Sequence, residues 1–550
     1  MLNTGERLDQ VILKACRQYR DKIAYTCMDA HLSYRQLEGY SAHFCAYLQQ
    51  HTDLRPGERI AIQLPNLLQY PVVLLGALRA GLVVVNTNPV YSPRELEHQL
   101  ADSGARALVV LANTAASAAQ ILSRTPVKYV IVTELADLHP PLKRLLINFV
   151  ARYVKKLVPA FRFSESISFR KSLALGRSAL KKHPDMLEQP VALSASDPVA
   201  ELAVLQYTGG TTGVAKGAML THANLVANLY QVKSHLAEEC PGPGEVMVAP
   251  LPLYHIYAFT MNIAYTLHQG IHNILIPDPR DIPAFVKAIK PYRIAGFVGL
   301  NTLYNALSMN SEFSRLDFSA LKISSSGGMA LSTKTYRRWL DLTGCRIIEG
   351  YGLTETSPLV ACNSEAAFQE GSIGRPVPQT QVKVVDEAGH ELPAGEAGEL
   401  CVKGPQVMAG YWQNHQETEK VLDADGWLRT GDVAVIQPDG FIRIVDRIKD
   451  VIIVAGFNVF PNEIEDHVCR HPDVREAAAI GVQRGENGQK VKLFVVAASP
   501  GLSKAAILEH CRQGLAPYKI PRLIEFCDTL PKSNVGKVLR RALRDPEKHG

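Results

Sequence analysis

Short runs of apolar, largely β-branched residues alternate with amphipathic stretches along most of the chain. Residues 59–64, 108–111 and 129–132 are such apolar runs and predict buried strands. Residues 92–102 and 114–122 lie between these runs and have the spacing of amphipathic helices. Alternation of this kind is typical of parallel or mixed sheets whose two faces are covered by helices. The predicted fold class is therefore α/β.

A second, smaller unit is predicted beyond residue 440. The apolar run 440–445 ends in a charged segment at 446–450. A helical pattern from about residue 462, an apolar run at 492–496 and a helical pattern at 504–513 follow it. These elements suffice for a small α+β domain.

Length and composition bound the class of protein. A chain of 550 residues exceeds what one hydrophobic core ordinarily supports, so at least two domains are expected. Residues 184–198 are polar and interrupted by prolines, which indicates a connection between subdomains. The hydrophobic fraction of 47% and the charged fraction of 20% are those of a soluble globular protein. A net charge of +6 is small for this size, so it does not indicate nucleic-acid binding, although it is compatible with anionic ligands such as ATP and CoA.

Cysteine usage and apolar stretches bear on the compartment. The ten cysteines are scattered without a Cys-x-x-Cys pair, so we expect reduced, mostly buried thiols. The first ten residues contain no apolar core and do not have the pattern of a signal peptide. The longest apolar stretch, residues 70–85, is interrupted by Arg79 and is shorter than the ~20 residues of a membrane-spanning helix. The predicted location is cytoplasmic, or peripheral on the inner face of the cell membrane.

The most informative segment is residues 206–217, which read Gln-Tyr-Thr-Gly-Gly-Thr-Thr-Gly-Val-Ala-Lys-Gly. Its glycines permit backbone conformations in which successive N–H groups point to one place, and its threonines and Lys216 add hydroxyl donors and a positive charge. The combination predicts a loop that binds polyphosphate. It is not the common P-loop, because no hydroxyl residue follows the lysine. The alternative is a flexible surface loop.

Four further motifs follow in order. Residues 351–356 read Tyr-Gly-Leu-Thr-Glu-Thr, residues 430–432 Thr-Gly-Asp, residues 446–450 Asp-Arg-Ile-Lys-Asp, and residues 531–537 Pro-Lys-Ser-Asn-Val-Gly-Lys. Together with the polyphosphate loop, they resemble the signature motifs of the adenylate-forming superfamily, which contains acyl-CoA synthetases, firefly-type luciferases and adenylation domains of peptide synthetases. Residues 425–465 are similar to the signature of long-chain fatty-acyl-CoA synthetases, especially the bacterial ones.

The resemblance covers nearly the whole chain and implies a division of labour between two domains. It implies a large N-terminal AMP-binding domain over residues 1–446, with mixed or parallel sheets flanked by helices, that holds the ATP, Mg²⁺ and acyl sites. A hinge at 447–450 and a small mobile α+β domain over 451–550 would follow. The implied reaction has two steps, in which a carboxylate attacks ATP to give acyl-AMP and pyrophosphate, and the CoA thiol then displaces AMP.

The resemblance also implies which residues contact the nucleotide. They are Thr208, Gly209, Gly210, Thr211, Thr212, Gly213, Lys216, Gly350, Tyr351, Asp432 and Arg447. Thr208 and Glu355 would hold Mg²⁺, a hard cation that prefers oxygen ligands. Tyr351 would stack on adenine, and Asp432 would accept hydrogen bonds from the ribose. The plainer alternatives are a solvated carboxylate for Glu355, a core aromatic for Tyr351 and a turn cap for Asp432.

Four residues are implied to act in catalysis: Lys537, Thr354, Glu355 and His255. Because one anion attacks another, we expect charge neutralisation and positioning to dominate. Lys537 would bridge the attacking carboxylate and the α-phosphate, Thr354 would meet one of these two groups, and His255 would lie beside the acyl carboxylate. Lys449 matches the hinge position. Without the motifs, Lys449 and Lys537 would read as solvated charges of a linker and a basic tail.

The acyl substrate is the least constrained part of the prediction. Amino-acid-activating relatives place an aspartate near the segment 250–257, and none occurs between Pro250 and Gly270, which disfavours amino acids. Segments 299–304 and 324–330 are small or apolar and suit the wall of an alkyl tunnel, in which each buried methylene contributes about 0.8 kcal/mol. Ordinary core packing is the alternative for most of these residues.

Residues 143–162 combine six basic residues with many apolar ones. This basic amphipathic pattern suits an interfacial helix that gathers fatty acids from a bilayer. A solvated helix packed on its own domain is the alternative.

The resemblance therefore implies a long-chain fatty acid–CoA ligase that forms AMP, with Mg²⁺ as cofactor and fatty acid, ATP and CoA as substrates. The alternatives are an acyl-AMP ligase that serves a separate carrier, a medium-chain or aryl acid–CoA ligase, and a lipid-binding protein that has lost catalysis. Peripheral membrane contact is a further expectation, whereas nucleic-acid binding is not expected. Chain-length preference, the CoA-contacting residues and the oligomeric state, for which a homodimer is one option, stay open.

Overall fold

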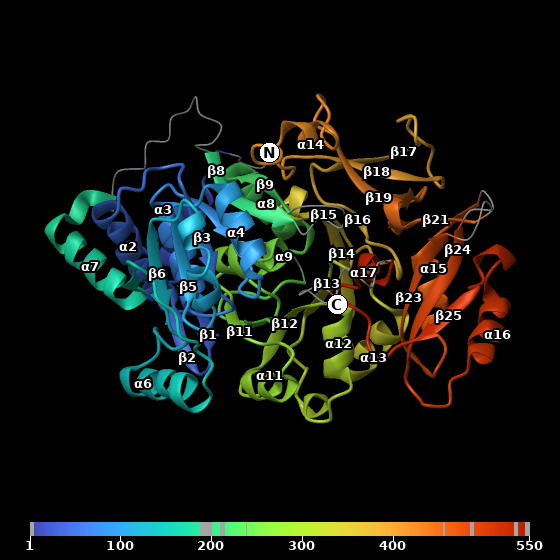
Figure 1. Ribbon diagram of the computed structural model, residues 1–550, viewed down its shortest axis with the longest axis horizontal. Coiled ribbons are helices and arrows are strands. Elements are labelled where there is room, and N and C mark those ends of the chain that lie inside the picture. Colours follow the sequence, from blue (N-terminus) through green and yellow to red (C-terminus); the bar gives the residue numbers. More distant parts are fainter. Residues whose placement is uncertain are drawn as a thin grey trace.

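A computed structural model of the chain describes residues 5–187, 201–208, 215–237, 239–454, 457–483, 489–532 and 537–544. Two large sheets with flanking helices make up most of the molecule, a four-stranded sheet lies beside them, and the C-terminal elements gather at one end (Figure 1). The predicted α/β class is confirmed, with a large N-terminal part of mixed sheets and a smaller C-terminal part.

The first large sheet has nine strands in the order β16-β15-β14-β13-β12-β10-β11-β1-β2. The six strands from β14 to β1 in this order are parallel, and β2, β15 and β16 pair antiparallel at the edges. The strands are β1 Ile23–Cys27, β2 Ala30–Ser33, β10 Val246–Ala249, β11 His272–Leu275, β12 Ile294–Gly299, β13 Ile323–Ser326, β14 Ile347–Gly352, β15 Leu359–Cys362 and β16 Arg375–Pro376.

The second large sheet has seven strands in the order β7-β6-β5-β3-β4-β8-β9, and only the pair β8–β9 is antiparallel. Its strands are β3 Arg59–Gln63, β4 Val83–Asn86, β5 Ala107–Leu111, β6 Tyr129–Thr133, β7 Ile167–Ser168, β8 Leu202–Thr208 and β9 Lys216–Thr221. Strands β3, β4 and β5 are almost entirely buried, as expected for a parallel sheet that is covered on both faces.

Helices connect and cover these strands. They are α1 Leu8–Gln18, α2 Tyr34–His51, α3 Gln69–Arg79, α4 Pro93–Ser103, α5 Ala115–Ala119, α6 Pro141–Phe149, α7 Phe169–Lys182, α8 His222–His235, α9 Ile256–Phe259, α10 Thr266–His268, α11 Ile282–Ile289, α12 Asn301–Ser308 and α13 Thr333–Thr343. Helix α4 shows how locally the sequence specifies such an element. Ser92 and Glu95 form a capping box, Pro93 occupies the first turn, and Gly104 ends the helix at φ 62°.

The four-stranded antiparallel sheet consists of β17 Gln381–Val385, β18 Ala397–Lys403, β19 Leu428–Ile436 and β20 Ile442–Arg447, with α14 at His415–Glu419. The C-terminal elements are β21 Ile452–Val454, β22 Phe457–Val459, α15 Pro461–Cys469, β23 Val474–Gln483, β24 Gln489–Ala497, α16 Lys504–Gly514, β25 Leu523–Phe526 and α17 Arg540–Arg544. Apolar clusters between Leu8 and Ile442 are separate from those between Ile452 and Leu543, so the C-terminal part has a core of its own.

The segment predicted to form a helix over 143–162 is helical over a shorter range. Helix α6 continues into one π-helical turn at Val150–Val154, and the helix ends there. Lys156 has φ 50°, a left-handed conformation that a right-handed helix cannot include, and Pro159 follows it. Most of the proline-interrupted connection at 184–198 lies outside the described residues. Among those that are described, no helix is both long enough and apolar enough to cross a bilayer.

Candidate active site

The two ends of the predicted polyphosphate loop are held by the hairpin β8–β9. Thr208 ends β8 at the carboxyl edge of the sheet, and it pairs directly with Lys216, the first residue of β9. Gly209, Gly210, Thr211, Thr212 and Gly213 lie outside the described residues. The carboxyl edge of a parallel sheet is the usual place for a bound nucleotide.

Lys216 is surrounded by groups that the sequence did not single out. Its ammonium forms an ion pair with Glu417 of α14, and its Nζ lies 4.8 Å from the centre of the Tyr411 ring. Hydrogen bonds from Lys216 and Lys420 lower the pKa of the Glu417 carboxyl to about 2. Lys216 is therefore held at one side of the loop by a charge and an aromatic face.

Tyr411 joins the polyphosphate loop to the motif at 351–356. Its hydroxyl donates to Oε1 of Glu355 over 2.7 Å, and the backbone N–H of Met408 donates to the Glu355 carbonyl over 2.8 Å. The segment 408–412 reaches this place because it pairs with β9, with Met219 N–H donating to the Gly410 carbonyl over 2.9 Å. Tyr411 therefore contacts both Lys216 and Glu355.

The backbone around the same motif requires glycine. A Cβ on Gly352 would lie 2.0 Å from the carbonyl oxygen of Pro358, and a Cβ on Gly327 would lie 3.1 Å from that of Gly350. The 2.0 Å approach at Gly352 excludes a larger residue there, whereas the 3.1 Å approach at Gly327 leaves only little room for one. The approach at Gly352 lets β14 run directly into the short 3₁₀ turn Thr354–Thr356, which presents Thr354 and Glu355.

A second cluster forms around Asp432, which is 2% exposed. The hydroxyl of Tyr351 donates to Asp432 Oδ2 over 2.6 Å, and Nε of Arg447 lies 3.0 Å from Asp432 Oδ1. Asp432 and Arg447 face one another because they are directly paired in β19 and β20. Burial and the Asp432 carboxylate hold the pKa of Tyr351 well above its usual value. The three predicted nucleotide residues therefore form one hydrogen-bonded group.

Lys537 approaches this cluster from the C-terminal part. Burial lowers the pKa of Lys537 to about 8, with further lowering by Arg447 and Lys449, while Asp432 acts in the opposite sense. Lys449 is exposed at its surface, but loss of solvent around its ammonium and the charge of Arg447 lower its pKa as well. Both lysines thus lie within electrostatic range of Arg447 and of Asp432.

His255 stands at the start of α9, apart from these charges. Its Nδ1 accepts a hydrogen bond from the backbone N–H of Tyr257 over 3.3 Å, and burial lowers the pKa of His255 to about 4. A neutral imidazole at pH 7 can donate a hydrogen bond to a carboxylate but adds no charge. Next to it, the Tyr257 hydroxyl lies 3.0 Å from Oγ of Ser325, and the Tyr257 ring lies against Gly327.

The segments proposed for the acyl wall divide into two kinds. Ser325 and Gly327 lie beside Tyr257 and Gly350, close to the site. Tyr304 is fully buried in an apolar cluster, and its hydroxyl donates to the Ser325 carbonyl over 2.7 Å. Tyr304 is therefore an ordinary core residue, which is the alternative to a place in the acyl wall.

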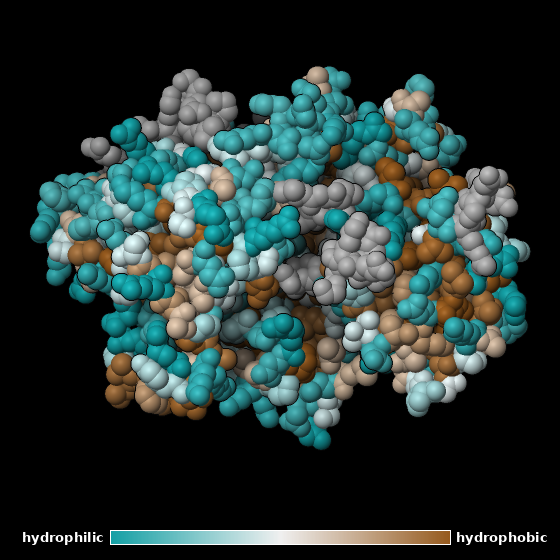
Figure 2. Space-filling model, viewed as in Figure 1, coloured by the Kyte–Doolittle hydropathy of each residue, from teal (hydrophilic) through white to brown (hydrophobic). Residues whose placement is uncertain are grey.

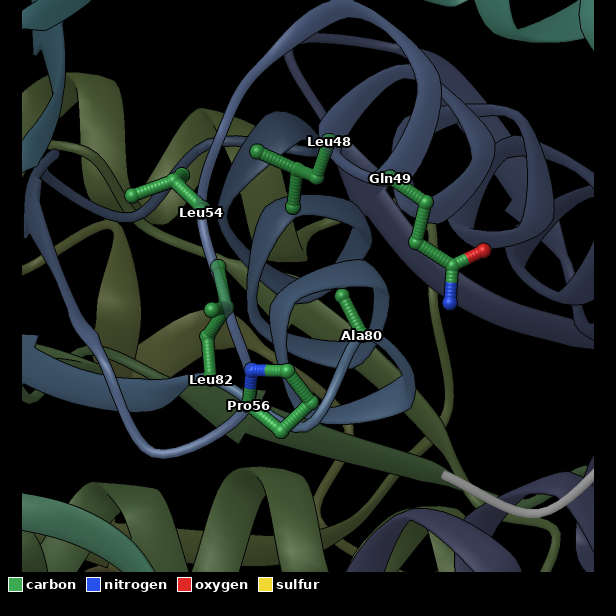
Figure 3. A pocket seen from close by; sticks show the side chains of 6 residues that line it. All are labelled: Leu48, Gln49, Leu54, Pro56, Ala80 and Leu82. Atoms are coloured by element: carbon green, nitrogen blue, oxygen red, sulfur yellow. The ribbon is translucent and has the colours of Figure 1, made fainter. Parts of the chain in front are cut away.

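A cavity of about 180 Å³ lies away from these residues (Figure 3). It is lined by Leu48, Gln49, Leu54, Pro56, Ala80 and Leu82. Pro56 and Leu82 precede β3 and β4, so the cavity lies at the amino edge of the sheet, opposite Thr208. It is not part of the candidate site.

Residues 12–412 match the family of AMP-binding enzymes, and residues 463–537 match the AMP-binding enzyme C-terminal domain. The chain belongs to the AMP-binding enzyme family. A long-chain-fatty-acid–CoA ligase of Salmonella typhimurium is 49% identical to this AMP-binding enzyme over 98% of the chain and 94% of the relative.

Solved structures share the fold over nearly the whole length. The anthranilate CoA ligase AuaEII in complex with anthranoyl-AMP has a TM-score of 0.82 at 25% identity and covers 99% of this chain and 97% of its own. MatB from Rhodopseudomonas palustris is 27% identical, with 99% of both chains covered, and has a TM-score of 0.77 in its ATP-bound form and 0.68 in its apo form.

Proposed function

We propose that the protein is an AMP-forming long-chain fatty acid–CoA ligase, which converts a fatty acid, ATP and CoA into acyl-CoA, AMP and diphosphate through an acyl-adenylate. The observation that carries this proposal is that Asp432, Tyr351 and Arg447 form one cluster, with Lys537 of the C-terminal part within electrostatic range of Asp432 and Arg447, while Tyr411 links Lys216 and Glu355. The 49% identity to a long-chain-fatty-acid–CoA ligase over almost the whole chain supports the choice of substrate.

In the first step, positive charge has to be placed between two anions. Lys537 and Arg447 supply it at the α-phosphate and the attacking carboxylate, and Lys216 supplies it at the β- and γ-phosphates.

The remaining residues bind the ribose, the adenine and the acid. Asp432 accepts hydrogen bonds from the ribose hydroxyls, because a carboxylate that is already bonded to Tyr351 and Arg447 retains further lone pairs. Tyr351 presents its ring to adenine. Thr354 and the neutral His255 act as hydrogen-bond donors to the acyl carboxylate.

Mg²⁺ fits the chemistry of the two residues proposed to hold it. The Thr208 hydroxyl at the end of β8 and the Glu355 carboxylate are both hard oxygen donors, and Mg²⁺ commonly takes only one or two ligands from protein. The hydrogen bond from Tyr411 fixes the orientation of Glu355. When bound, Mg²⁺ would neutralise charge on the phosphates of ATP.

We further propose that residues 1–446 and 451–550 move relative to one another about a hinge at 447–450. The separate apolar cores of the two parts support rigid-body motion, and the exposure of Lys449 leaves room for its backbone to turn. Lys537 would leave the site in this motion, after which the CoA thiol displaces AMP from the acyl-adenylate.

Peripheral membrane contact is proposed at the segment formed by α6 and the π turn, because this segment is oriented with its apolar face outward. Its exposed side chains are Leu142, Leu145, Leu146, Phe149, Tyr153, Val154 and Leu157, of which Leu142 is 84% exposed. In Figure 2 they correspond to the hydrophobic patch at the lower left, over α6 of Figure 1. The polar face turns inward, where Arg152 and Asn148 bond to Glu134 over 2.7 Å and 2.9 Å.

An exposed apolar face flanked by Lys143, Arg144, Lys155 and Lys156 suits the interface of an anionic bilayer. Flotation with vesicles of phosphatidylethanolamine and phosphatidylglycerol tests this. We expect the wild type to float and the double variant Leu145→Glu/Phe149→Glu to stay in the dense fraction. Met309→Glu, which changes a side chain 68% exposed on a different part of the surface, should float like the wild type. Flotation of the double variant would contradict the proposal.

The activity itself is tested with a chain-length series of carboxylates from hexanoate to oleate, with benzoate included. We expect kcat/KM to be highest for oleate and palmitate. One AMP should form for each acyl-CoA. A maximum at hexanoate or benzoate would favour the medium-chain or aryl alternative. Release of pyrophosphate with oleate but no transfer to CoA would favour a carrier-dependent acyl-AMP ligase.

A further inference from the structure

Asp446 is a buried carboxylate that plays no part in the chemistry proposed above. It is 1% exposed and lies in β20, next to Arg447 and immediately before the proposed hinge. Its Oδ1 accepts the backbone N–H of Arg447 over 2.8 Å. Its Oδ2 accepts the backbone N–H of Asn462 over 2.8 Å, and Asn462 lies beyond the hinge. Asp446, which immediately precedes the hinge, therefore bonds both to the first hinge residue and to a residue beyond the hinge.

The bond to Asn462 caps a helix of the C-terminal part. Helix α15 begins at Pro461, and its own N-cap residue, Phe460, has no side-chain oxygen to satisfy the first N–H groups. The Asp446 carboxylate provides that oxygen from the N-terminal side of the hinge, and its negative charge is favourable at a helix N-terminus. Asn462 strengthens the connection by donating from Nδ2 to the carbonyl of Val445 over 3.2 Å.

Arg540 connects the same place to the segment that carries Lys537. Its guanidinium donates to Oδ1 of Asn462 over 2.6 Å and to Glu465 over 2.8 Å, and it lies 3.9 Å from Asp446. Arg540 also lies 3.4 Å from Asp450. It follows Lys537 by three residues, so the position of Arg540 restricts where the Lys537 ammonium can reach.

We infer that Asp446 is a positioning residue that holds the C-terminal part in the orientation in which Lys537 lies within electrostatic range of Asp432 and Arg447. The inference rests on the proposed two-step function. It agrees with the higher TM-score to ATP-bound MatB than to apo MatB, at the same identity and coverage. The contacts from Asp446 to Asn462 and Arg540 cross the hinge, so they must break before the C-terminal part can turn for the second step.

Asp446 therefore acts oppositely on the two half-reactions. Removing its carboxylate withdraws the cap of α15 and one partner of Arg540, while Glu465 and Asp450 continue to hold Arg540. The docked orientation then loses population, and adenylate formation slows with it. Transfer from a supplied acyl-adenylate to CoA needs the other orientation, so it is kept or becomes faster.

The experiment compares the half-reactions in Asp446→Ala and the wild type. Adenylate formation is measured as exchange of labelled pyrophosphate into ATP with oleate and no CoA, and transfer as oleoyl-CoA formation from supplied oleoyl-AMP. We expect exchange to fall about tenfold and transfer to stay within about twofold or to rise. Asp446→Asn, which keeps an oxygen for the Asn462 N–H, should recover much of the exchange. Asp439→Ala, in the exposed turn between β19 and β20, is the matched control and should change neither rate.

An equal loss in both half-reactions would overturn the inference, since it would show general structural damage. Unchanged exchange in Asp446→Ala would overturn it too, as would a larger loss in transfer than in exchange. Absence of exchange in the wild type with any fatty acid would instead refute the proposed function.

Discussion

The phosphate side of the candidate site, around Lys216, Tyr411 and Glu355, is assembled from elements of the N-terminal part alone. The side around Asp432 and Arg447 receives Lys537 from the C-terminal part, across the proposed hinge. The first side is held by pairing with β9 and by hydrogen bonds within the N-terminal part, whereas under the proposed function the second side would be complete only while the C-terminal part is docked. Under the proposed function, the comparison suggests a division of labour: the N-terminal part alone would bind the phosphates of ATP, while the C-terminal part would supply Lys537 for the first step and withdraw it for the second.

The largest expected effect belongs to Lys537→Ala. Loss of the charge at the attacking carboxylate should slow pyrophosphate exchange by about a hundredfold or more, a magnitude typical of one lost transition-state contact. Transfer from supplied oleoyl-AMP to CoA should stay within about threefold. Lys532→Ala in the same tail, which loses an ion pair to Glu476, is the control and should retain both rates. Equal losses in both steps would remove the distinction between the two sides of the site.

The pH dependence sharpens the same distinction. The pKa of Lys537 is lowered to about 8 in the free protein, and only the protonated ammonium below that pKa can bridge two anions. We therefore expect kcat/KM for adenylate formation to fall about tenfold per unit as pH rises above about 8. In Lys537→Arg the guanidinium stays charged, so this fall should be absent. A fall that persists in the arginine variant would have to come from another group.

Double variants test whether the two sides depend differently on docking. In a Lys537→Ala background, adding Asp446→Ala should reduce exchange by less than about twofold, because the docked lysine has already been lost. In a Glu355→Gln background, the same change should keep its full effect of about tenfold, because Glu355 does not depend on the C-terminal part. Full additivity in both backgrounds would show that Asp446 does not act through Lys537.

The smallest expected effect is that of Tyr411→Phe. The change removes the 2.7 Å hydrogen bond to Glu355 and leaves the ring beside Lys216 in place. We expect the free energy of Mg²⁺ binding to weaken by about 1 kcal/mol, the typical contribution of one hydrogen bond. This corresponds to about a fivefold rise in the Mg²⁺ concentration needed for half-maximal exchange. Titration of Mg²⁺ at saturating ATP and oleate measures it. An unchanged Mg²⁺ requirement would show that Tyr411 does not contribute to Mg²⁺ binding through Glu355.

Much of the fold could be predicted from local pattern. Strand β3 at Arg59–Gln63 and helix α4 follow from apolar periodicity and from the cap at Ser92. Helix α6 was predicted too long, because the chain leaves the helix through a positive φ at Lys156, and no pattern encodes a positive φ at a lysine.

The candidate site was predictable only in part, because some of its contacts join distant segments. Asp432 and Tyr351 could be named from motifs, and the structure brings them within 2.6 Å of one another. Tyr411 was missed, because its local sequence marks it only weakly and its contact with Glu355 arises only when the segment 408–412 pairs with β9. The pattern Gly410-Tyr411-Trp412, two aromatics after a glycine, was the one available signal.

The central claim is that one crevice activates an aliphatic acid with ATP before CoA takes part. Exchange of labelled pyrophosphate into ATP by the purified wild type, with oleate present and CoA absent, tests it most directly. The account predicts rapid exchange that requires both oleate and Mg²⁺. Exchange that does not respond to any fatty acid from hexanoate to oleate would contradict it.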